Sequence, residues 1–265
     1  MFKPLFPALV QLCERHGVEV MSSVAPLVWV TLGTHRERTL IEPPNDRLFT
    51  YLFVNNQMVS NGGGLHMTEI HLLECLATVL SPERIFVIGN AYGWSTLGIA
   101  LAFPKAKVVA VDDGRAFGSR EGIDWTNRTA KAEGLDVIAV GGTSPADVER
   151  IVGEHLTGKI DLVLIDGSHT NKQQTADFLA CQAVASADCV YLLHDVVNWD
   201  MAESFMEIRR LTDATLKGEI LTRTASGMGI FYPKPLAPGL EPLLFTFIDR
   251  RAFTPFAPLA APAGS

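Results

Sequence analysis

The stretch IFVIGNAYGWSTLGIALAFPKAKVVAVDD, residues 85–113, decides how this chain folds. It opens with an apolar run at 85–89 that ends in a glycine, and it closes with a second run at 107–112 that ends in a carboxylate. The residues at 95–103 between them have the spacing and composition of a helix. The stretch therefore predicts a strand, a helix and a second strand, which is the repeating unit of a parallel sheet.

The same alternation continues along the chain. Further strands are predicted at 135–140, 160–166 and 189–195, and further helices at 123–133, 145–155, 173–185 and 201–211. Pro145 is expected in the first turn of its helix, behind Ser144 as the cap, because a first-turn residue needs no partner for its N–H. The strands are nearly unbroken apolar runs, so helices should cover both faces of the sheet. These features predict an α/β fold with an open, doubly wound, Rossmann-like sheet.

The C-terminal part departs from this alternation. Two runs, GEILTRT at 218–224 and MGIFY at 228–232, flank a short turn that contains Gly227. Strands joined so closely pair antiparallel, so we expect a hairpin here. After Pro233 the chain is rich in Pro and Ala, and its last ten residues are expected to form a loose tail.

The N-terminal part lacks strand–helix alternation. A short helix is expected at 9–15, and an amphipathic helix with Thr68 as its cap is expected at 67–80. The chain is therefore expected to consist of three parts: an N-terminal helical extension or lid at 1–66, a core domain at 67–232 and the tail at 233–265.

Composition excludes several classes of function. The 265 residues carry 22 Lys and Arg against 29 Asp and Glu, a formal charge of −7, so no basic excess is present to favour a nucleic-acid partner. The cysteines form no CxxC pair, which disfavours structural zinc and a disulfide framework. Buried thiols in a reducing compartment are expected instead. No apolar run is long enough to span a bilayer, so a cytoplasmic location without a membrane partner is expected.

The loop after the first strand carries the first functional signal. Ligands of doubly wound sheets bind outside the carboxyl ends of the strands. This loop has glycines at 89 and 93, a GxxxG pattern. The GxGxxG pattern of dinucleotide sites and the lysine of a Walker loop are absent, which disfavours an NAD-dependent oxidoreductase. Asp112 ends the second strand, where it can accept hydrogen bonds from a ribose. Together these residues predict a site for a nucleoside without a pyrophosphate.

At this point the sequence resembles a known family. The segments VIGNAYGWSTLGIA, VVAVDD, IDLVLIDGSH and YLLHD are similar to those of the class I S-adenosylmethionine (SAM) dependent methyltransferases. They are most similar to the metal-assisted O-methyltransferase branch, of the catechol and macrolide or sugar type. The resemblance spans roughly residues 67–232 and implies a seven-stranded sheet whose last strand is antiparallel. It also implies that residues 67–232 are a SAM-binding methyltransferase domain.

The resemblance implies a role for each loop residue. Gly89, Asn90 and Ser95 would line the methionine part of SAM, and Gly93 and Trp94 belong to the same motif. Asp112 would hold the ribose hydroxyls, with Asp113 as its adjacent competitor. The adenine would lie near Thr143 and Ser144. Asp166 would lie beside the sulfonium and also face a metal ion.

A metal site has its own chemistry. Asp166 and Asp195 end neighbouring strands, so both carboxylates should face one pocket, where Mg²⁺ or Mn²⁺ could bind and activate a substrate hydroxyl. Relatives carry an acidic residue where this chain has His194. Two interpretations stay open. Either His194 replaces that carboxylate as the third ligand and shifts the preference towards Mn, Fe or Zn, or the site is incomplete.

Other side chains are candidates for the same pocket. His169, three residues beyond Asp166, could take the proton from a substrate hydroxyl, although a helix cap or an exposed histidine would fit equally. His66 is a candidate lid residue, against an ordinary packed histidine. Trp94, Trp125 and Trp199 could wall the pocket or simply pack. Three arginines could attract an anionic substrate or form a solvated helix face: Arg115, Arg120 and Arg128.

The sequence therefore favours a SAM-dependent methyltransferase that O-methylates a small hydroxylated metabolite such as a sugar, polyol or phenol. The alternative is a catalytically silent methyltransferase fold that serves as a binding or assembly module. The expected partner is a small-molecule substrate. The apolar N-terminal stretch could also cover a second subunit, so a homo-oligomer stays open.

Overall fold

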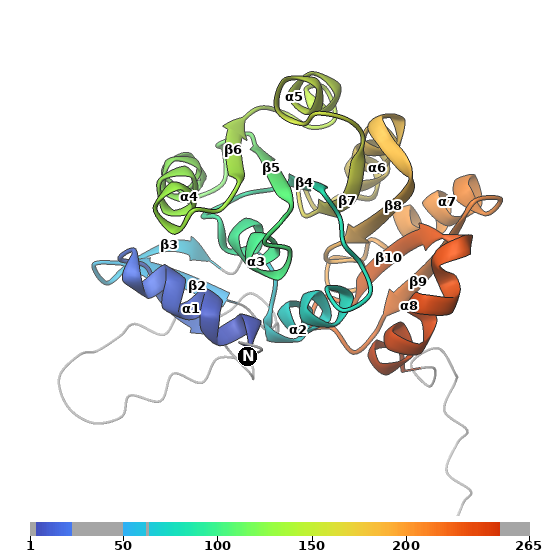
Figure 1. Ribbon diagram of the computed structural model, residues 1–265, viewed down its shortest axis with the longest axis horizontal. Coiled ribbons are helices and arrows are strands. Elements are labelled where there is room, and N and C mark those ends of the chain that lie inside the picture. Colours follow the sequence, from blue (N-terminus) through green and yellow to red (C-terminus); the bar gives the residue numbers. More distant parts are fainter. Residues whose placement is uncertain (1–3, 23–49, 62–63, 250–265) are drawn as a thin grey trace, which may run out of the picture.

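A seven-stranded sheet forms the centre of the protein in a computed structural model that describes residues 4–22, 50–61 and 64–249 (Figure 1). Its strands are β4 (Arg84–Ile88), β5 (Lys107–Asp112), β6 (Val137–Gly141), β7 (Ile160–Ile165), β8 (Ala185–Leu193), β9 (Leu216–Leu221) and β10 (Met228–Pro233). They lie in the order β6-β5-β4-β7-β8-β10-β9. The first five in this order are parallel, and β10 pairs antiparallel with both β8 and β9. The predicted sheet and its C-terminal hairpin are confirmed.

Alternation along β4 explains why both faces of the sheet are covered. Ile85 and Val87 belong to one apolar core, whereas Phe86 and Ile88 belong to the other, as side chains on a strand point to opposite faces. The first core is covered by α1 (Leu5–Arg15), α2 (Met67–Leu76), α3 (Trp94–Ala102), α4 (Ser119–Glu133) and α8 (Ala237–Leu244). The second is covered by α5 (Val148–His155), α6 (Asn171–Val184) and α7 (Ala202–Thr212). This is the doubly wound arrangement that unbroken apolar strands predict.

The strand order reverses beside β4, and this places the site. From β4 the chain moves outward through β5 to β6, and it then returns to β7 on the other side of β4. The loops that follow β4 and β7 therefore leave in opposite directions and open a crevice at the carboxyl edge.

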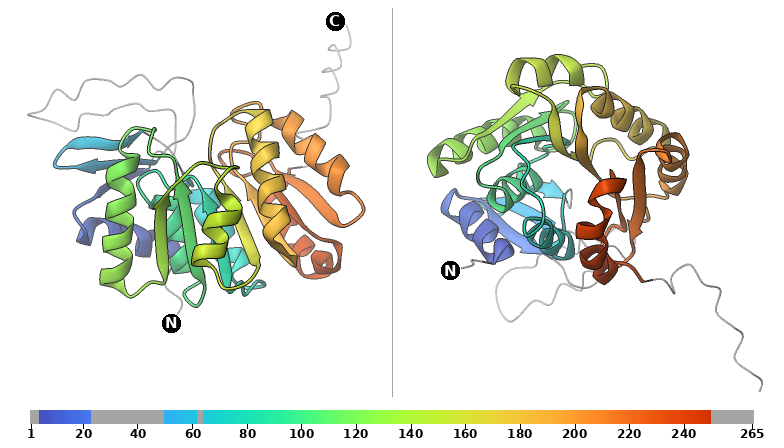
Figure 2. Two further views of the ribbon diagram at one scale, coloured as in Figure 1. Left: turned by 90° about the horizontal axis from the view of Figure 1, so that it is seen from above. Right: turned by 45° about the vertical axis from the view of Figure 1, so that its right-hand side comes forward.

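The N-terminal part contains more than the predicted helix. The helix α1 begins at Leu5, earlier than expected, and three short strands form an antiparallel sheet that was not predicted: β1 (Glu19–Ser22), β2 (Thr50–Val54) and β3 (Gln57–Asn61). Asn55 and Asn56, with φ of 51° and 62°, make the two-residue turn between β2 and β3, a conformation that Asn tolerates. Figure 2 shows this small sheet and the β9–β10 hairpin at opposite ends of the molecule.

The segment after Pro233 is also ordered where it is described. It forms η1 (Lys234–Leu236), α8 and η2 (Phe245–Phe247), and it buries Leu240 and Leu244 in the core that also contains α2. The ten C-terminal residues, expected to be a loose tail, lie outside the described residues. None of the helices within the described ranges has the length and apolar character that crossing a bilayer requires.

The start predicted for α5 is wrong, and so are the caps predicted for α5 and α2. The helix α5 begins at Val148, and the Ser144–Pro145 bond before it is cis, so Pro145 is not in a first turn. Ser144 is not the cap, because its hydroxyl donates a hydrogen bond to Asp177 at 2.6 Å. The helix α2 is capped at His66, whose backbone N–H donates to Glu69 at 2.7 Å. Thr68 instead accepts a hydrogen bond from the backbone N–H of Ala225.

Candidate functional site

A cavity of about 660 Å³ opens at the carboxyl ends of β4, β5 and β7. Its lining includes most of the residues that the sequence singled out: Gly89, Asn90, Trp94, Ser95, Asp112, Asp113, Thr143, Ser144, Asp166 and His169. Residues from distant parts of the chain thus share one cavity. Gly93, His194 and Asp195 are not in its lining and lie behind these residues.

The two glycines of the first loop bring backbones together. Gly89 has a φ of 94°, and a Cβ there would collide with the carbonyl oxygen of Asp166. Gly93, with a φ of 83°, precedes α3, and a Cβ there would collide with the Thr126 hydroxyl. Both positions therefore require glycine for a positive φ and for close packing. The close approach at Gly89 sets the end of β4 directly against the end of β7.

Asp112 holds the first loop in shape. Its Oδ2 accepts hydrogen bonds from the backbone N–H groups of Asn90 at 3.0 Å and Ala91 at 2.7 Å. Its Oδ1 accepts one from the backbone N–H of Gly114 at 2.8 Å. The neighbouring Asp113 is more exposed and lies 3.7 Å from Arg115 in an ion pair. Because each carboxylate oxygen can accept more than one hydrogen bond, Asp112 can support the loop and also accept a hydrogen bond from a ribose hydroxyl.

The other polar side chains of this loop point into the protein. The Asn90 amide is buried, accepts a hydrogen bond from Thr96 at 2.9 Å and donates one to Thr126 at 3.2 Å. Trp94 Nε1 donates to the carbonyl of Leu65 at 2.6 Å, and Ser95 Oγ accepts from the N–H of Leu65 at 3.0 Å. Trp94 and Ser95 therefore fasten the segment before α2 to the start of α3.

The opposite wall of the cavity contains a carboxylate that sequence reasoning missed. Asp177, on α6, lines the cavity and accepts hydrogen bonds from Ser144 at 2.6 Å and Gln173 at 2.8 Å. Burial raises the pKa of this carboxyl despite both hydrogen bonds. Its sequence signal is weak, because a single Asp within a helix is usually exposed.

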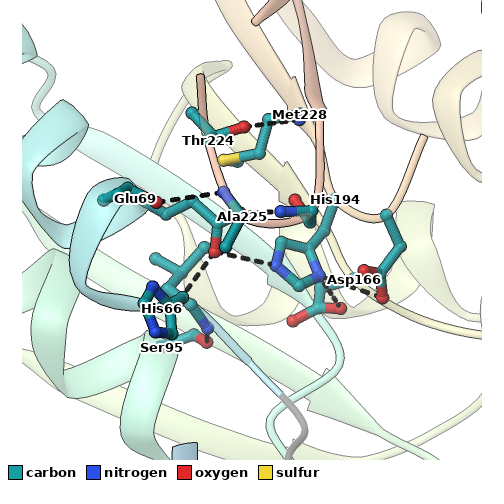
Figure 3. Close-up of polar contacts among 12 residues, drawn as sticks. His66, Glu69, Ser95, Asp166, His194, Thr224, Ala225 and Met228 are labelled. Carbon is teal, nitrogen blue, oxygen red and sulfur yellow. Dashed lines mark hydrogen bonds and ion pairs between the residues drawn. The ribbon is translucent and has the colours of Figure 1, made fainter. Parts of the chain in front are cut away.

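A cluster of acids and histidines forms the deep end of the site (Figure 3). Asp166 follows β7, and His194 and Asp195 follow β8. His194 Nδ1 lies 3.0 Å from Asp166 Oδ1 and 3.2 Å from Asp195 Oδ2. His169 Nε2 approaches the same two oxygens, at 3.9 Å and 3.1 Å. Asp195 has a φ of 60°, a left-handed conformation that costs a non-glycine residue energy and is typical of functional sites.

The cluster has a fifth member that the sequence did not predict. Glu69, on α2, is fully buried, and its Oε2 lies 3.2 Å from His194 Nε2. Figure 3 shows it on the side of His194 opposite Asp166. Glu69 lies within the mostly apolar stretch MTEIHLLECL, and a carboxylate in such a stretch is the sequence signal that could have identified it.

Burial and charge oppose each other in this cluster. Burial by itself would raise the pKa of Asp166 and Asp195, but the charge of His194 and the nearby imidazole of His169 outweigh it and lower both values. Burial would lower the pKa of His169, but hydrogen bonds to Asp166 and Asp195 raise it to about 9. The three carboxylates, Glu69 included, are therefore held in their charged form by cations.

The donor atoms suit a divalent cation. Asp166, His169 and Asp195 each offer one ligand atom, and these three atoms lie within 4.8 Å of one another. This group contains His169 where the sequence predicted His194. However, His194 Nδ1 is buried, faces two of the same oxygens and forms no hydrogen bond with any described residue. A buried ring nitrogen without a hydrogen bond beside two carboxylates is what a nitrogen-and-oxygen metal site offers.

Of the remaining candidates, few reach the cavity. Trp199 stacks on His169, with ring centres 4.5 Å apart, and so borders the cluster. Trp125 is not in the cavity lining; it packs against Tyr92, which is, and donates a hydrogen bond to the carbonyl of His16. His66 is buried at the start of α2 and is not in the cavity lining. Among the three arginines, Arg115 lines the cavity and Arg120 and Arg128 do not.

Comparisons with known proteins agree with this picture. A family model described as a methyltransferase domain matches residues 86–196. No curated protein matches the sequence. The fold is similar to that of an O-methyltransferase from Bacillus cereus in complex with SAH, with 14% identity, a TM-score of 0.52 and coverage of 66% of this chain and 84% of that one. It is also similar to the O-methyltransferase TomG from Streptomyces achromogenes in complex with SAM, with 16% identity, a TM-score of 0.50 and coverage of 64% and 81%.

These findings bear out the resemblance drawn from the loops. The matched segment runs from β4 to the residue after Asp195, so it contains the first loop and every member of the acid–histidine cluster except Glu69. The chain has the fold of these O-methyltransferases, and residues 86–196 match the methyltransferase-domain model.

Proposed function

We propose that this chain, with its methyltransferase domain at 86–196, is a SAM-dependent O-methyltransferase that acts on a small hydroxylated metabolite. One observation carries the proposal. The loop that suits an adenosyl group and the cluster that suits a hydroxyl group border the same cavity, joined by the contact between Gly89 and Asp166. A cofactor lying across that contact would present its methyl group to the cluster.

The residues that line the cavity support one position for the cofactor. Asp112 and Asp113 would accept hydrogen bonds from the ribose hydroxyls. Thr143 and Ser144 lie further along the same wall, where the adenine would rest. The carboxylate of Asp166, also in the lining, would lie near the positive sulfonium.

The chemistry requires alignment and removal of a proton. SAM, when bound, would supply a methyl group on a positive sulfonium, and the acceptor oxygen would displace S-adenosylhomocysteine, which takes the electrons of the carbon–sulfur bond. His169 lines the cavity, so its imidazole, in the neutral form that prevails above its pKa of about 9, takes the hydroxyl proton. The contacts with Asp166 and Asp195 then stabilise the imidazolium that forms.

Asp166, His194 and Asp195 would hold a divalent ion, which when bound lowers the pKa of a substrate hydroxyl and orients it. His194 lies behind the cavity lining, so this assignment leaves His169 as the histidine that substrate meets. Phenols, sugars and polyols are all compatible substrates, because each carries a hydroxyl group that must lose its proton before it is methylated. The four cysteines are free, which suits a reducing, cytoplasmic setting.

Calorimetry with SAM and S-adenosylhomocysteine tests the proposal. We expect both to bind with micromolar dissociation constants and to raise Tm, since a ligand that binds the folded state stabilises it. Absence of binding would refute a methyltransferase. Binding without methyl transfer to any of a panel of phenols, sugars and polyols, with Mg²⁺ or Mn²⁺ added, would favour the silent binding module instead.

A further inference from the structure

Glu69 is tied to the cluster by three contacts. Its side chain has no exposed surface, and its Oε1 accepts a hydrogen bond from the backbone N–H of Ser226 at 2.8 Å. Its Oε2 accepts one from the backbone N–H of His66 at 2.7 Å and lies 3.2 Å from His194 Nε2. These contacts join α2, the turn between β9 and β10, and the end of β8 at one carboxylate (Figure 3).

The contacts fix which nitrogen of His194 carries a proton. An ionised carboxylate only accepts hydrogen bonds, so the hydrogen shared with Glu69 Oε2 belongs to His194 Nε2. Metal binding would displace the second proton of the ring and leave the lone pair on Nδ1, which faces Asp166 and Asp195. A carboxylate behind a histidine in this way is the usual support of a metal-binding imidazole.

The distances around Nδ1 agree with a shared ion. Ligands about 2.1 Å from an octahedral cation lie roughly 3.0 Å from their neighbours. His194 Nδ1 lies 3.0 Å and 3.2 Å from the two carboxylate oxygens, and it forms no hydrogen bond with any described residue. The nitrogen is therefore positioned as a ligand, alongside two oxygens.

We propose that Glu69 is a positioning residue that presents His194 Nδ1 as a nitrogen ligand, and that the site consequently selects Mn²⁺, Fe²⁺ or Zn²⁺ over Mg²⁺. The inference rests on the proposed function, because it assigns the metal of that same site. A site of oxygens alone suits Mg²⁺, whereas an imidazole ligand favours transition metals.

Binding of the metals alone tests this inference on the full, metal-stripped chain. Calorimetry should show Mn²⁺ binding at least tenfold tighter than Mg²⁺. Glu69→Gln should weaken Mn²⁺ binding by 10- to 100-fold, the usual effect of losing such a support. Glu74→Gln is the matched control: the residue lies on the same helix but pairs with His71 outside the cluster, so Mn²⁺ binding should not change.

A second variant decides the outcome if Glu69→Gln does not fold. His194→Asn exchanges the nitrogen ligand for an amide, and the ratio of Mn²⁺ to Mg²⁺ affinity should fall at least tenfold. Unchanged Mn²⁺ binding in folded Glu69→Gln, or an unchanged ratio in His194→Asn, overturns the inference. Binding of S-adenosylhomocysteine is measured in parallel, so a loss confined to metal binding is distinguished from failure of the proposed function.

Discussion

The two sides of the cavity are built in different ways. The side proposed for the adenosyl group is organised by one short stretch, residues 89–95, whose backbone is held by the carboxylate of Asp112, with Thr143 and Ser144 further along the same wall. The reacting side combines side chains from α2, the end of β7 and the end of β8, at sequence separations of up to 125 residues. The first side depends on backbone shape, and the second depends on charge.

This difference determines what each side can tolerate. The loop at residues 89–95 is shaped by backbone hydrogen bonds to Asp112, on the neighbouring strand. Substitutions far from this loop should therefore leave its conformation unchanged. Buried carboxylates need their cations, since an unpaired buried charge costs several kcal/mol. Substitutions on the two sides should therefore affect different measurements.

The largest effect is expected on the reacting side. His169→Gln should lower turnover by 10²- to 10⁴-fold, the usual contribution of a general base, because the substrate proton loses its acceptor. Its dissociation constant for SAM should change less than fivefold, since the adenosyl side is untouched. Steady-state kinetics and calorimetry measure the two quantities. A loss of SAM affinity as large as the loss of turnover would contradict the division between the sides.

A glycine tests the adenosyl side through stability. Gly89→Ala should destabilise the fold by about 3 kcal/mol, because of the positive φ and the collision with the Asp166 carbonyl. Tm should then fall by roughly 6–12 °C. Gly153→Ala, inside α5 with open space around the position, is the control and should be neutral or slightly stabilising. Thermal melts of both variants would show whether the backbone contact matters; equal melting temperatures would argue that it does not.

A smaller effect is expected from the carboxylate that holds the loop. Asp112→Asn keeps the size of the side chain but removes the charge that accepts hydrogen bonds from the N–H groups of Asn90 and Ala91. Charge-assisted hydrogen bonds are the stronger kind, so SAM affinity should fall about tenfold, or ~1.4 kcal/mol. Turnover at saturating SAM should stay within about threefold of wild type. If Asp112→Asn binds SAM as tightly as wild type, the Asp112 carboxylate does not contribute to the cofactor site.

The smallest effect lies away from both sides, where α1 meets α4. Hydrogen bonds from His16 and Arg15 lower the pKa of Glu133. Because the folded pKa is below the unfolded one, the resulting stability is complete above the ordinary Glu value and is lost as pH falls through the folded pKa. Glu133→Gln should therefore lower the free energy of unfolding at pH 6 by under ~1 kcal/mol, seen as a slightly lower Tm, and the difference in Tm from wild type should narrow below about pH 4. SAM binding should be unaffected, and any change in it would link α1 to the cavity.

Much of the fold could be predicted because its signals are local. The apolar runs gave the strands of the large sheet, and the GxxxG loop and Asp112 fall in one cavity. The small N-terminal sheet escaped because its strands are short and its Asn55–Asn56 turn lacks the usual glycine. The roles of Glu69 and Asp177 could not be predicted, because their partners, His194 and Ser144, lie far away in the sequence.

The helix α2, which carries Glu69, contacts both the acid–histidine cluster and α8. The helix α2 carries the buried Glu69 and packs against α8. Leu240 and Leu244 of α8 are buried in the same core as α2. A protein shortened to end at Pro233 would leave the flank of α2 that packs against α8 uncovered, and the helix could then shift on its axis. The helix α8 therefore helps to hold the Glu69 carboxylate against the His194 imidazole, although it lies outside the segment that the family model matches.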